Sequence, residues 1–195
     1  MAEESIDVIS PGEAAPDFDL RGTDGERYSP EDFAGYDAML LVFTCNHCPY
    51  AKAKIPVLNA LAAEYDEVAV VGVNSNDNPD YPDDDFEHMV EAVEDGTVQY
   101  DAYLFDPTQE VAAAYGAVCT PDPFLFSNDD GTFFLAYHGR LDDATNPDDE
   151  PTREEMREAI DAVLAGEAVP LEGRPSRGCT IKWREGNEPA YWAAL

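Results

Sequence analysis

Two short, uninterrupted apolar segments separated by a helical pattern constrain the fold of this chain most. Residues 38–43 and 68–73 read Ala-Met-Leu-Leu-Val-Phe and Val-Ala-Val-Val-Gly-Val, without a charged side chain. Runs of this length are typical of strands buried on both faces, as in a parallel sheet covered by helices. Between them, apolar residues recur at helical spacing over about 49–65. The sequence therefore contains a β–α–β unit and predicts an α/β fold.

Turn and cap signals extend this unit in both directions. Asp24-Gly25 predicts an N-terminal β-hairpin over about 17–28, and Asn128-Asp129-Asp130-Gly131 predicts a second hairpin over 123–137. Helix starts are predicted from an Asp N-cap with proline after it and from a Thr-x-x-Glu capping box. The remaining predicted elements are a helix over 86–93, a strand over 102–105, a helix from Asp106-Pro107 to Gly116, and a helix from Thr152-x-x-Glu155 to Gly166.

This order of elements predicts a central mixed sheet flanked by helices. We expect one domain over residues 1–195, with a core of about 10–166 and a C-terminal extension over 167–195.

The charge balance excludes several kinds of partner. The chain has 42 Asp and Glu against 11 Lys and Arg, a formal net charge of −31. No basic patch could meet the phosphates of a nucleic acid or an anionic membrane. The acids are spread along the chain, as in Asp83-Asp84-Asp85, and are interpreted as a solvated surface adapted to molar salt, where screening weakens self-repulsion. A surface for basic partners is the alternative.

The first residues show neither the positive segment nor the apolar segment of a signal peptide. No apolar run approaches the roughly 20 residues of a membrane helix. We therefore expect a cytoplasmic protein. In a reducing compartment, its four cysteines are expected to be catalytic or metal-binding rather than structural.

The motif Cys45-Asn46-His47-Cys48 lies between the first buried strand and the predicted helix. Free N–H groups and the positive end of the helix dipole stabilise a thiolate there, so we expect the pKa of Cys45 to fall below the free value of about 8.5. Cys45 is then expected to attack and Cys48 to resolve the mixed disulfide, while His47 favours the thiolate or relays a proton. A lone Cys-x-x-Cys can also be half of a zinc site, but the strand–helix context favours redox chemistry.

A second segment of interest surrounds Pro121, which leads into a predicted strand. Its peptide bond is a candidate for the cis form, with an ordinary trans bond as the alternative. Cys119 is either a third redox partner or a small buried hydrophobe. Cys179 is interpreted as a packing residue beside Ile181 and Trp183 rather than as a resolving cysteine.

The other two histidines are assigned to the scaffold. His88 lies on a short acid-rich helix and is predicted to be solvated, and His138 is predicted to be structural. His138 would be the additional ligand if the chain bound a metal.

Together the motifs resemble the thioredoxin-like superfamily, and most closely its peroxiredoxin-like members, the alkyl hydroperoxide reductase/thiol-specific antioxidant group. The resemblance implies a thioredoxin-like fold in which Cys45 and Cys48 are the redox pair and Pro121 is a cis-proline packed against them. It implies that Thr120 offers its backbone to a bound thiol partner. The similarity covers about residues 10–185 and is carried by the segments 11–20, 24–25, 44–50, 74–77, 115–123 and 178–183.

One departure from that group concerns peroxidase activity. Its Pro-x-x-x-Thr-x-x-Cys pattern is absent, because no proline precedes Thr44 at that spacing and Cys48 follows Thr44 one residue too late. Dithiol chemistry is therefore expected ahead of peroxidase chemistry.

The functional expectation is a thiol–disulfide oxidoreductase or peroxiredoxin-like antioxidant enzyme. Its partners would be a protein thiol or disulfide, or a small peroxide, together with a cellular dithiol reductant. No organic cofactor is expected, because the chain has no glycine-rich phosphate loop and no dinucleotide fingerprint. The alternatives are a copper- or zinc-binding delivery module on the same fold, for which thiolate and imidazole ligands are suited, and a scaffold with inert cysteines.

Overall fold

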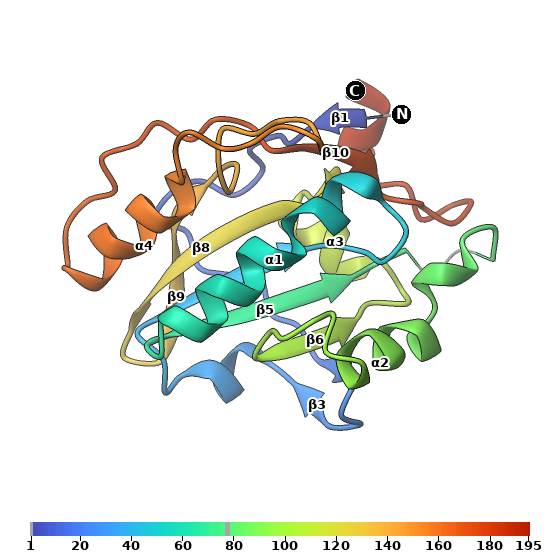
Figure 1. Cartoon of the computed structure of the whole chain (residues 1–195), viewed down its shortest axis with the longest axis horizontal. Coiled ribbons are helices and arrows are strands. Elements are labelled where there is room, and N and C mark those ends of the chain that lie inside the picture. The colour runs from blue at the N-terminus through green and yellow to red at the C-terminus, as the bar shows by residue number, and fades with distance from the viewer. Residues whose placement is uncertain (1, 77–78) are drawn as a thin grey trace.

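A seven-stranded mixed sheet forms the centre of the molecule in the computed structural model, which describes residues 2–76 and 79–195 (Figure 1). Labels with η denote short 3-10 helices. In chain order, the elements are β1 (Ala2–Glu4), β2 (Leu20–Gly22), β3 (Arg27–Tyr28), η1 (Pro30–Phe33), β4 (Ala38–Phe43), α1 (Pro49–Glu64), β5 (Val68–Asn74), η2 (Pro82–Asp84), α2 (Phe86–Glu94), β6 (Ala102–Phe105), α3 (Glu110–Tyr115), β7 (Cys119–Thr120), β8 (Asp122–Asp129), β9 (Thr132–His138), α4 (Glu155–Leu164), β10 (Arg177–Thr180) and η3 (Ala190–Ala194).

The strands of the large sheet run in the order β3-β2-β6-β5-β4-β8-β9. The central strands β4, β5 and β6 are parallel, as the β–α–β pattern predicts, with Ala38 opposite Val68. The two predicted hairpins, β2–β3 and β8–β9, supply the antiparallel strands at the two edges. The predicted α/β fold with a mixed central sheet is confirmed.

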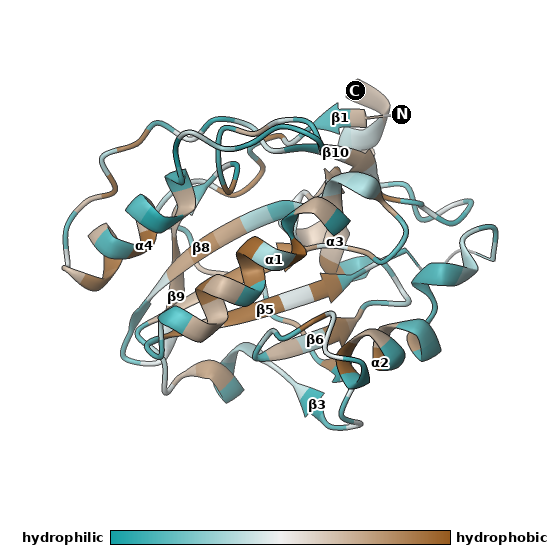
Figure 2. Cartoon of the chain, viewed as in Figure 1, coloured by the Kyte–Doolittle hydropathy of each residue, from teal (hydrophilic) through white to brown (hydrophobic). Residues whose placement is uncertain are grey.

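Strand β4 divides its side chains between two hydrophobic layers, because successive residues of a strand point to opposite faces. Leu40 packs with α1 and α4 on one face, whereas Leu41 belongs to the layer on the other. Every residue of β4 is inaccessible to solvent. Burying a side chain of this size contributes about 1.5–3 kcal/mol, so this strand is a rigid support for whatever follows it. Figure 2 shows the apolar residues concentrated in the central strands and the polar ones in the loops and outer helix faces.

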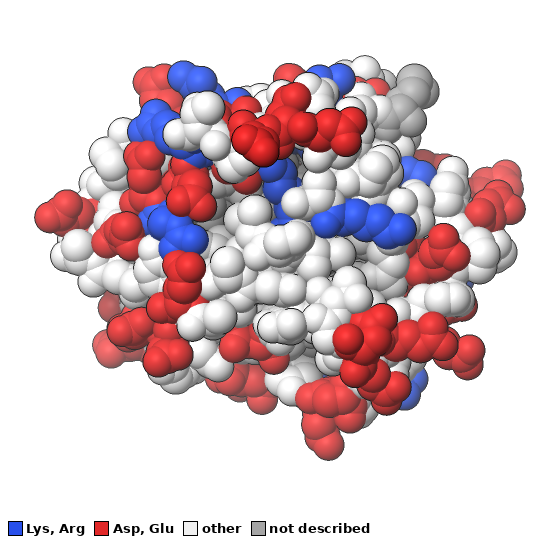
Figure 3. All heavy atoms as spheres, in the orientation of Figure 1, with Lys and Arg blue, Asp and Glu red and all other residues white. Residues whose placement is uncertain are grey.

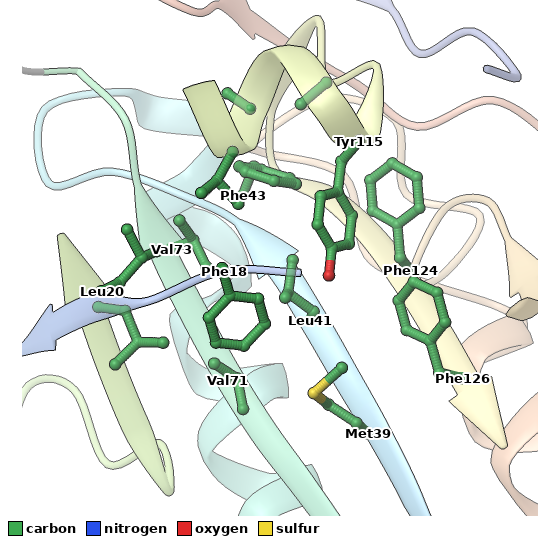
Figure 4. Close-up of a cluster of buried hydrophobic side chains, with 14 of the residues drawn as sticks. Phe18, Leu20, Met39, Leu41, Phe43, Val71, Val73, Tyr115, Phe124 and Phe126 are labelled. Carbon is green, nitrogen blue, oxygen red and sulfur yellow. The ribbon is translucent and has the colours of Figure 1, made fainter. Parts of the chain in front are cut away.

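The second layer is rich in aromatic rings (Figure 4). Phe43, at the end of β4, makes edge contacts with Tyr115 and Phe124 at ring-centroid distances of 5.5 and 5.9 Å. Tyr115 is anchored at its far end by donating a hydrogen bond to the Pro16 carbonyl. The end of β4, the helix α3 and the start of β8 are thereby fixed relative to one another.

Helix α3 begins later than the sequence predicts. Gln109 has a left-handed backbone, with φ of 64°, so the helix starts at Glu110 rather than after Asp106. The Gln109 amide donates to the carbonyls of Ser75 and Lys182, which ties the C-terminal segment to the core. Because the Gln109 side chain makes these bonds, it does not cap the start of α3. The predicted stop at Gly116 is confirmed, because Gly116 takes the left-handed conformation that ends α3.

The predicted capping box of α4 is wrong. Thr152 donates its hydroxyl and its backbone N–H to Asp143 instead of capping the helix. Glu155 forms a two-pronged ion pair with Arg140, at 2.5 and 2.9 Å. Helix α4 therefore begins at Glu155, with Glu154 before it as the cap.

A second, smaller sheet lies beside the functional region. It has the order β1-β10-β7, so β10, from near the C-terminal end, pairs on one side with the short strand that precedes Pro121 and on the other with β1. Figure 1 shows β1 and β10 together at one edge of the molecule, above the first turn of α1. The extension predicted over 167–195 thus contributes a strand to this region.

Acidic side chains are scattered over the face seen in Figure 3 rather than gathered in one block. Asp84 is an exception to the predicted solvated surface, because it is completely buried. None of the helices in the described residues is long and apolar enough to cross a membrane.

Candidate active site

The Cys-x-x-Cys motif occupies the loop between the end of β4 and the first turn of α1. Cys48 is the residue that precedes the helix, and Pro49 is its first residue. Both sulfurs are shielded from solvent, with Cys45 1% exposed and Cys48 0% exposed. All four cysteines are free thiols in this structure. The motif therefore has the predicted position in the fold, but it lies beneath the surface.

A chain of three sulfurs runs through the site. Cys45 and Cys48 pack together with Ala51, in the first turn of α1, and Cys179 packs against them. Four donors stabilise negative charge on the Cys48 sulfur and lower its pKa: the thiols of Cys45 and Cys179 and the backbone N–H groups of Ala51 and Cys179.

The lowered pKa predicted for Cys45 belongs to Cys48 instead. Hydrogen bonds from Cys45, from Cys179 and from the Ala51 N–H lower the pKa of Cys48 to about 4, against the opposing effect of burial. Burial, the hydrogen bond to Cys48 and the nearby Asp84 carboxylate raise the pKa of Cys45 well above that of a free thiol. The correction follows from where the helix begins, because the free N–H groups of its first turn are next to Cys48.

The segment around Pro121 closes the site from the other side. The Thr120–Pro121 peptide bond is cis, as the resemblance implies. The Thr120 hydroxyl lies 3.2 Å from the sulfur of Cys45, and the Thr120 carbonyl lies 3.4 Å from that of Cys48. The backbone edge that Thr120 was expected to offer to a partner is paired with β10, where Cys179 stands opposite Thr120.

Asp84 is the functional residue that sequence reasoning missed. One carboxylate oxygen accepts the backbone N–H groups of Asn46 and His47, at 2.7 and 2.9 Å. The other contacts the His47 ring and accepts from the Asn76 amide. A buried carboxylate with these partners holds the whole Cys-x-x-Cys loop in place. Asn74 and Asn76 both bind Asp84, but nothing in the sequence links them to this particular aspartate; Asp77 of the same segment lies outside the described residues.

His47 is brought next to Cys45 by this arrangement. The sulfur of Cys45, a ring nitrogen of His47 and a carboxylate oxygen of Asp84 all lie within 4.8 Å of one another. The His47 ring also packs on Tyr81, with the ring centroids 4.8 Å apart. His47 is therefore oriented on both sides and lies beside the Cys45 sulfur.

Among the cysteines predicted at the site, Cys119 stays outside the chain of sulfurs. It is completely buried on β7, where its sulfur faces the Pro121 carbonyl at 3.7 Å and the Ser176 carbonyl at 4.0 Å. Burial raises the pKa of its thiol well above the free value. This environment favours the buried-hydrophobe interpretation over that of a redox partner.

The structure places the other histidines where the sequence predicts. His138 lies between Asp122 and Asp7, at 2.9 and 3.0 Å, and stacks on Phe124. Both of its nitrogens are engaged, so it is a structural residue. His88 lies on the exposed side of α2 and pairs with the cap residue Asp85.

Among the described residues, one group could hold a metal ion, and it consists of Cys45, His47 and Asp84. His138 and Cys48 are not in it. Each oxygen of Asp84 already accepts two hydrogen bonds, so an ion would have to displace some of them. The side chains of Cys45, His47 and Asp84 therefore suit the hydrogen-bonded arrangement seen here better than they suit a metal ion.

A dithiol between a central strand and the first turn of a helix, set against a cis-proline, defines this chain as a thioredoxin-like protein. Within that class it belongs to the AhpC/TSA family, which residues 11–142 match. This agrees with the family resemblance inferred from the sequence motifs.

Solved structures of two bacterial proteins are similar over nearly the whole chain. An uncharacterised conserved protein from Geobacillus kaustophilus is 40% identical, with a TM-score of 0.86 over 94% of this chain and 97% of that one. A hypothetical protein from Sinorhizobium meliloti 1021 is 36% identical, with a TM-score of 0.86 over 94% and 99%. Thioredoxin-like protein YneN of Bacillus subtilis (strain 168) is 39% identical over 67 residues, which are 34% of this chain and 39% of that protein.

Proposed function

We propose that this protein is a thiol–disulfide oxidoreductase in which Cys45 and Cys48 alternate between dithiol and disulfide. The observation that supports this most is the packing of the two buried thiols on each other at the start of α1, where both sulfurs contact Thr120, at 3.2 and 3.4 Å. Sulfurs packed this closely need little movement to form a disulfide. Membership of the AhpC/TSA family supports the same kind of chemistry.

The attacking sulfur in this proposal is Cys48 rather than Cys45, because Cys48 immediately precedes α1, where its pKa is lowered, whereas the pKa of Cys45 is raised. The Cys48 thiolate attacks one oxygen of a peroxide and becomes a sulfenic acid, and the other oxygen leaves as an alcohol or water. Cys45 then attacks the Cys48 sulfur, which forms the disulfide and releases water. With a disulfide as electrophile, the same steps pass through a mixed disulfide and release two thiols.

Burial of both sulfurs favours a small electrophile for the first step. We propose a small peroxide or a low-molecular-weight disulfide, with a cytoplasmic dithiol to regenerate the enzyme. Thr120, which contacts Cys45 through its hydroxyl, and Asp84, which holds the loop, act as positioning residues. His47 is placed to exchange a proton with Cys45.

The test begins with fully reduced, metal-free protein in molar KCl. One equivalent of hydrogen peroxide, or of oxidised glutathione, is added, thiols are quenched with an alkylating agent at timed intervals, and disulfides are mapped by mass spectrometry. We expect a Cys45–Cys48 disulfide within seconds with at least one of the two oxidants, and none in Cys48→Ser. If both thiols stay reduced with both oxidants while the protein is folded, the proposal is wrong.

A metal-binding module is the second candidate, because Cys45, His47 and Asp84 supply three ligand atoms within 4.8 Å. It predicts that protein incubated with zinc retains one equivalent through gel filtration, and that His47→Ala loses it. The hydrogen bonds that saturate Asp84 are the reason for ranking it below dithiol chemistry.

The net charge of −31 supports one further proposal, that the surface is adapted to molar salt. The free energy of unfolding is then expected to rise steadily between low salt and molar KCl, and a flat dependence would contradict it.

A further inference from the structure

The buried pair needs a route to a reductant, because Cys45 and Cys48 are at most 1% exposed. The third sulfur of the chain, Cys179, differs from them in being partly exposed. It packs against Cys45 and Cys48 and stands opposite Thr120 in the strand pairing, so it connects the inner pair to the surface.

Strand β10 is built to hold Cys179 in that position. Cys179 stands opposite Thr120 in the antiparallel pairing of β10 with β7. The Ser176 hydroxyl donates to the Pro121 carbonyl at 2.6 Å, and Ile181 donates its N–H to Val118 at 2.9 Å, so the strand is anchored on both sides of Cys179.

Gly178 permits this close approach. A Cβ atom at Gly178 would lie 1.9 Å from the Thr120 carbonyl oxygen, a distance that no side chain can tolerate. The strand thus occupies the β7 edge beside the cis-proline and presents its own thiol there.

Lys182 is the positive charge that opposes the raised pKa of Cys179. Burial and the hydrogen bond to Cys48 raise the pKa of Cys179 to about 11, whereas the positive charge of Lys182 lowers it. Lys182 is one of only three lysines in the chain, and its amino group bonds to the Thr180 carbonyl in the same segment. Once Cys48 is oxidised, it is no longer a thiolate that accepts a hydrogen bond from the Cys179 thiol. That cause of the raised pKa of Cys179 is then absent.

We propose that Cys179 is a third redox thiol, which transfers the disulfide of the buried pair to the surface as a Cys48–Cys179 disulfide. This inference rests on the proposed function of Cys45 and Cys48. In this proposal, strand β10 supplies an internal thiol partner beside Thr120, where an external partner was expected from the sequence.

The exchange balances without any additional oxidant. The Cys179 thiolate attacks the Cys48 sulfur of the Cys45–Cys48 disulfide, the new sulfur–sulfur bond forms, and Cys45 leaves as a thiolate. The Thr120 hydroxyl, 3.2 Å away, hydrogen-bonds to the departing sulfur, and Cys45 takes up a proton equal to the one that Cys179 lost. A dithiol reductant then attacks Cys179, Cys48 leaves as its stabilised thiolate, and the second thiol of the reductant frees Cys179.

The first experiment uses the full chain with Cys45→Ala, which leaves Cys48 and Cys179 as the adjacent pair. One equivalent of diamide is added to the reduced protein, followed by alkylation and disulfide mapping. We expect a Cys48–Cys179 disulfide as the main product, with the same yield when Cys119→Ala is added as the matched control. If Cys48 and Cys179 both remain free, or Cys48 pairs with Cys119, the inference is overturned.

The second experiment uses Cys179→Ser with Cys45 and Cys48 intact. We expect its Cys45–Cys48 disulfide to form as in the wild type but to be reduced by dithiothreitol at least about tenfold more slowly, because the exposed sulfur is missing. Equal reduction rates would contradict the transfer step alone. Failure of the Cys45–Cys48 disulfide to form in either folded protein would contradict the proposed function itself.

A third variant, Gly178→Ala, tests the strand rather than the thiol. The added methyl group must displace β10 from Thr120, so we expect the diamide yield of Cys48–Cys179 to fall severalfold in the Cys45→Ala background. An unchanged yield would show that the docking of β10 does not position Cys179.

Discussion

Two buried histidine–aspartate pairs of this protein have different surroundings and different roles. His47 pairs with Asp84, and His138 pairs with Asp122; both aspartates are completely buried. Asp84 also accepts two backbone N–H groups from the cysteine loop. The second nitrogen of His138 instead contacts Asp7, which ties the N-terminal segment to the sheet.

A buried histidine–aspartate pair by itself therefore does not identify an active site. What distinguishes His47 is a reactive sulfur within 4.8 Å and a side chain that is 18% exposed. His138 is 4% exposed and stacked 4.0 Å from the centre of the Phe124 ring, so it has the surroundings of a core residue. Variants of the two pairs should therefore separate stability from reactivity.

The largest effect is expected from His138→Ala. Removing one partner of a buried pair leaves Asp122 uncompensated, which costs about 3–5 kcal/mol of unfolding free energy. In the folded fraction, the rate of Cys45–Cys48 oxidation should stay at the wild-type value. Denaturant unfolding in molar KCl at pH 6 measures the unfolding free energy, and timed alkylation measures the oxidation rate. A slowed oxidation with normal stability would reverse the roles given to the two pairs.

This effect should depend on pH in a defined direction. Burial lowers the pKa of His138, but Asp122 and Asp7 raise it by more, so the pKa in the folded state is above 6.5. A raised histidine pKa means that the stabilisation is fully present below the unfolded value of about 6.5 and is lost as the pH rises through the folded value. The difference between the wild type and His138→Ala is therefore expected to shrink above neutral pH. A difference that grows there would contradict the assignment.

Asp84 should show the next largest effect, in which reactivity changes together with stability. Asp84→Ala leaves two backbone N–H groups of the cysteine loop without an acceptor, which costs about 1–3 kcal/mol. Asp84→Asn keeps an acceptor oxygen and should recover most of this loss. It also removes the negative charge that raises the pKa of Cys45, so Cys45 should ionise at lower pH than in the wild type. An Asn variant as unstable as the Ala variant would show that the loop is not held by these bonds.

A smaller effect is expected on the thiolate of Cys48. The ultraviolet absorbance of thiolate should titrate with a midpoint near pH 4 in the wild type and disappear in Cys48→Ser. Cys45→Ala removes one hydrogen-bond donor and should raise the midpoint by about one pKa unit. Cys119→Ala is the matched control and should leave it unchanged. A midpoint near 8.5 in the wild type would return the attacking role to Cys45.

The smallest effect is expected at the third pair, His88–Asp85, in which both side chains are 46% exposed. Exposed ion pairs are screened and contribute little to stability. His88→Ala should therefore change neither the unfolding free energy nor the oxidation rate measurably. A clear change in either would show that exposure is not what separates the three pairs.

Much of the fold could be predicted from the sequence, because its central elements are set by local patterns. The apolar runs 38–43 and 68–73 correspond to β4 and most of β5, and the helical spacing after Cys48 corresponds to α1. The Asn128–Gly131 turn was recognisable because it joins two strands directly. In each case the signal lies within a few residues of the element.

The parts that could not be predicted depend on contacts between distant segments. Asp84 is indistinguishable in sequence from its solvated neighbours Asp83 and Asp85, and only its burial against the loop at 46–47 reveals its role. The pKa of Cys45 was assigned the wrong direction because the helix begins one residue past Cys48. The pairing of Cys179 with Thr120 joins strands that have no common pattern.

The short strand β7 is covered only by a segment from far along the chain. Sheet edges left open offer unpaired backbone groups to other chains and are a common origin of aggregation. The family region, residues 11–142, ends before β10. During synthesis, the reactive thiols and the open edge of β7 are therefore both in place before the strand that covers them emerges. Strand β10 follows both of them in the chain and protects them once it has paired with β7.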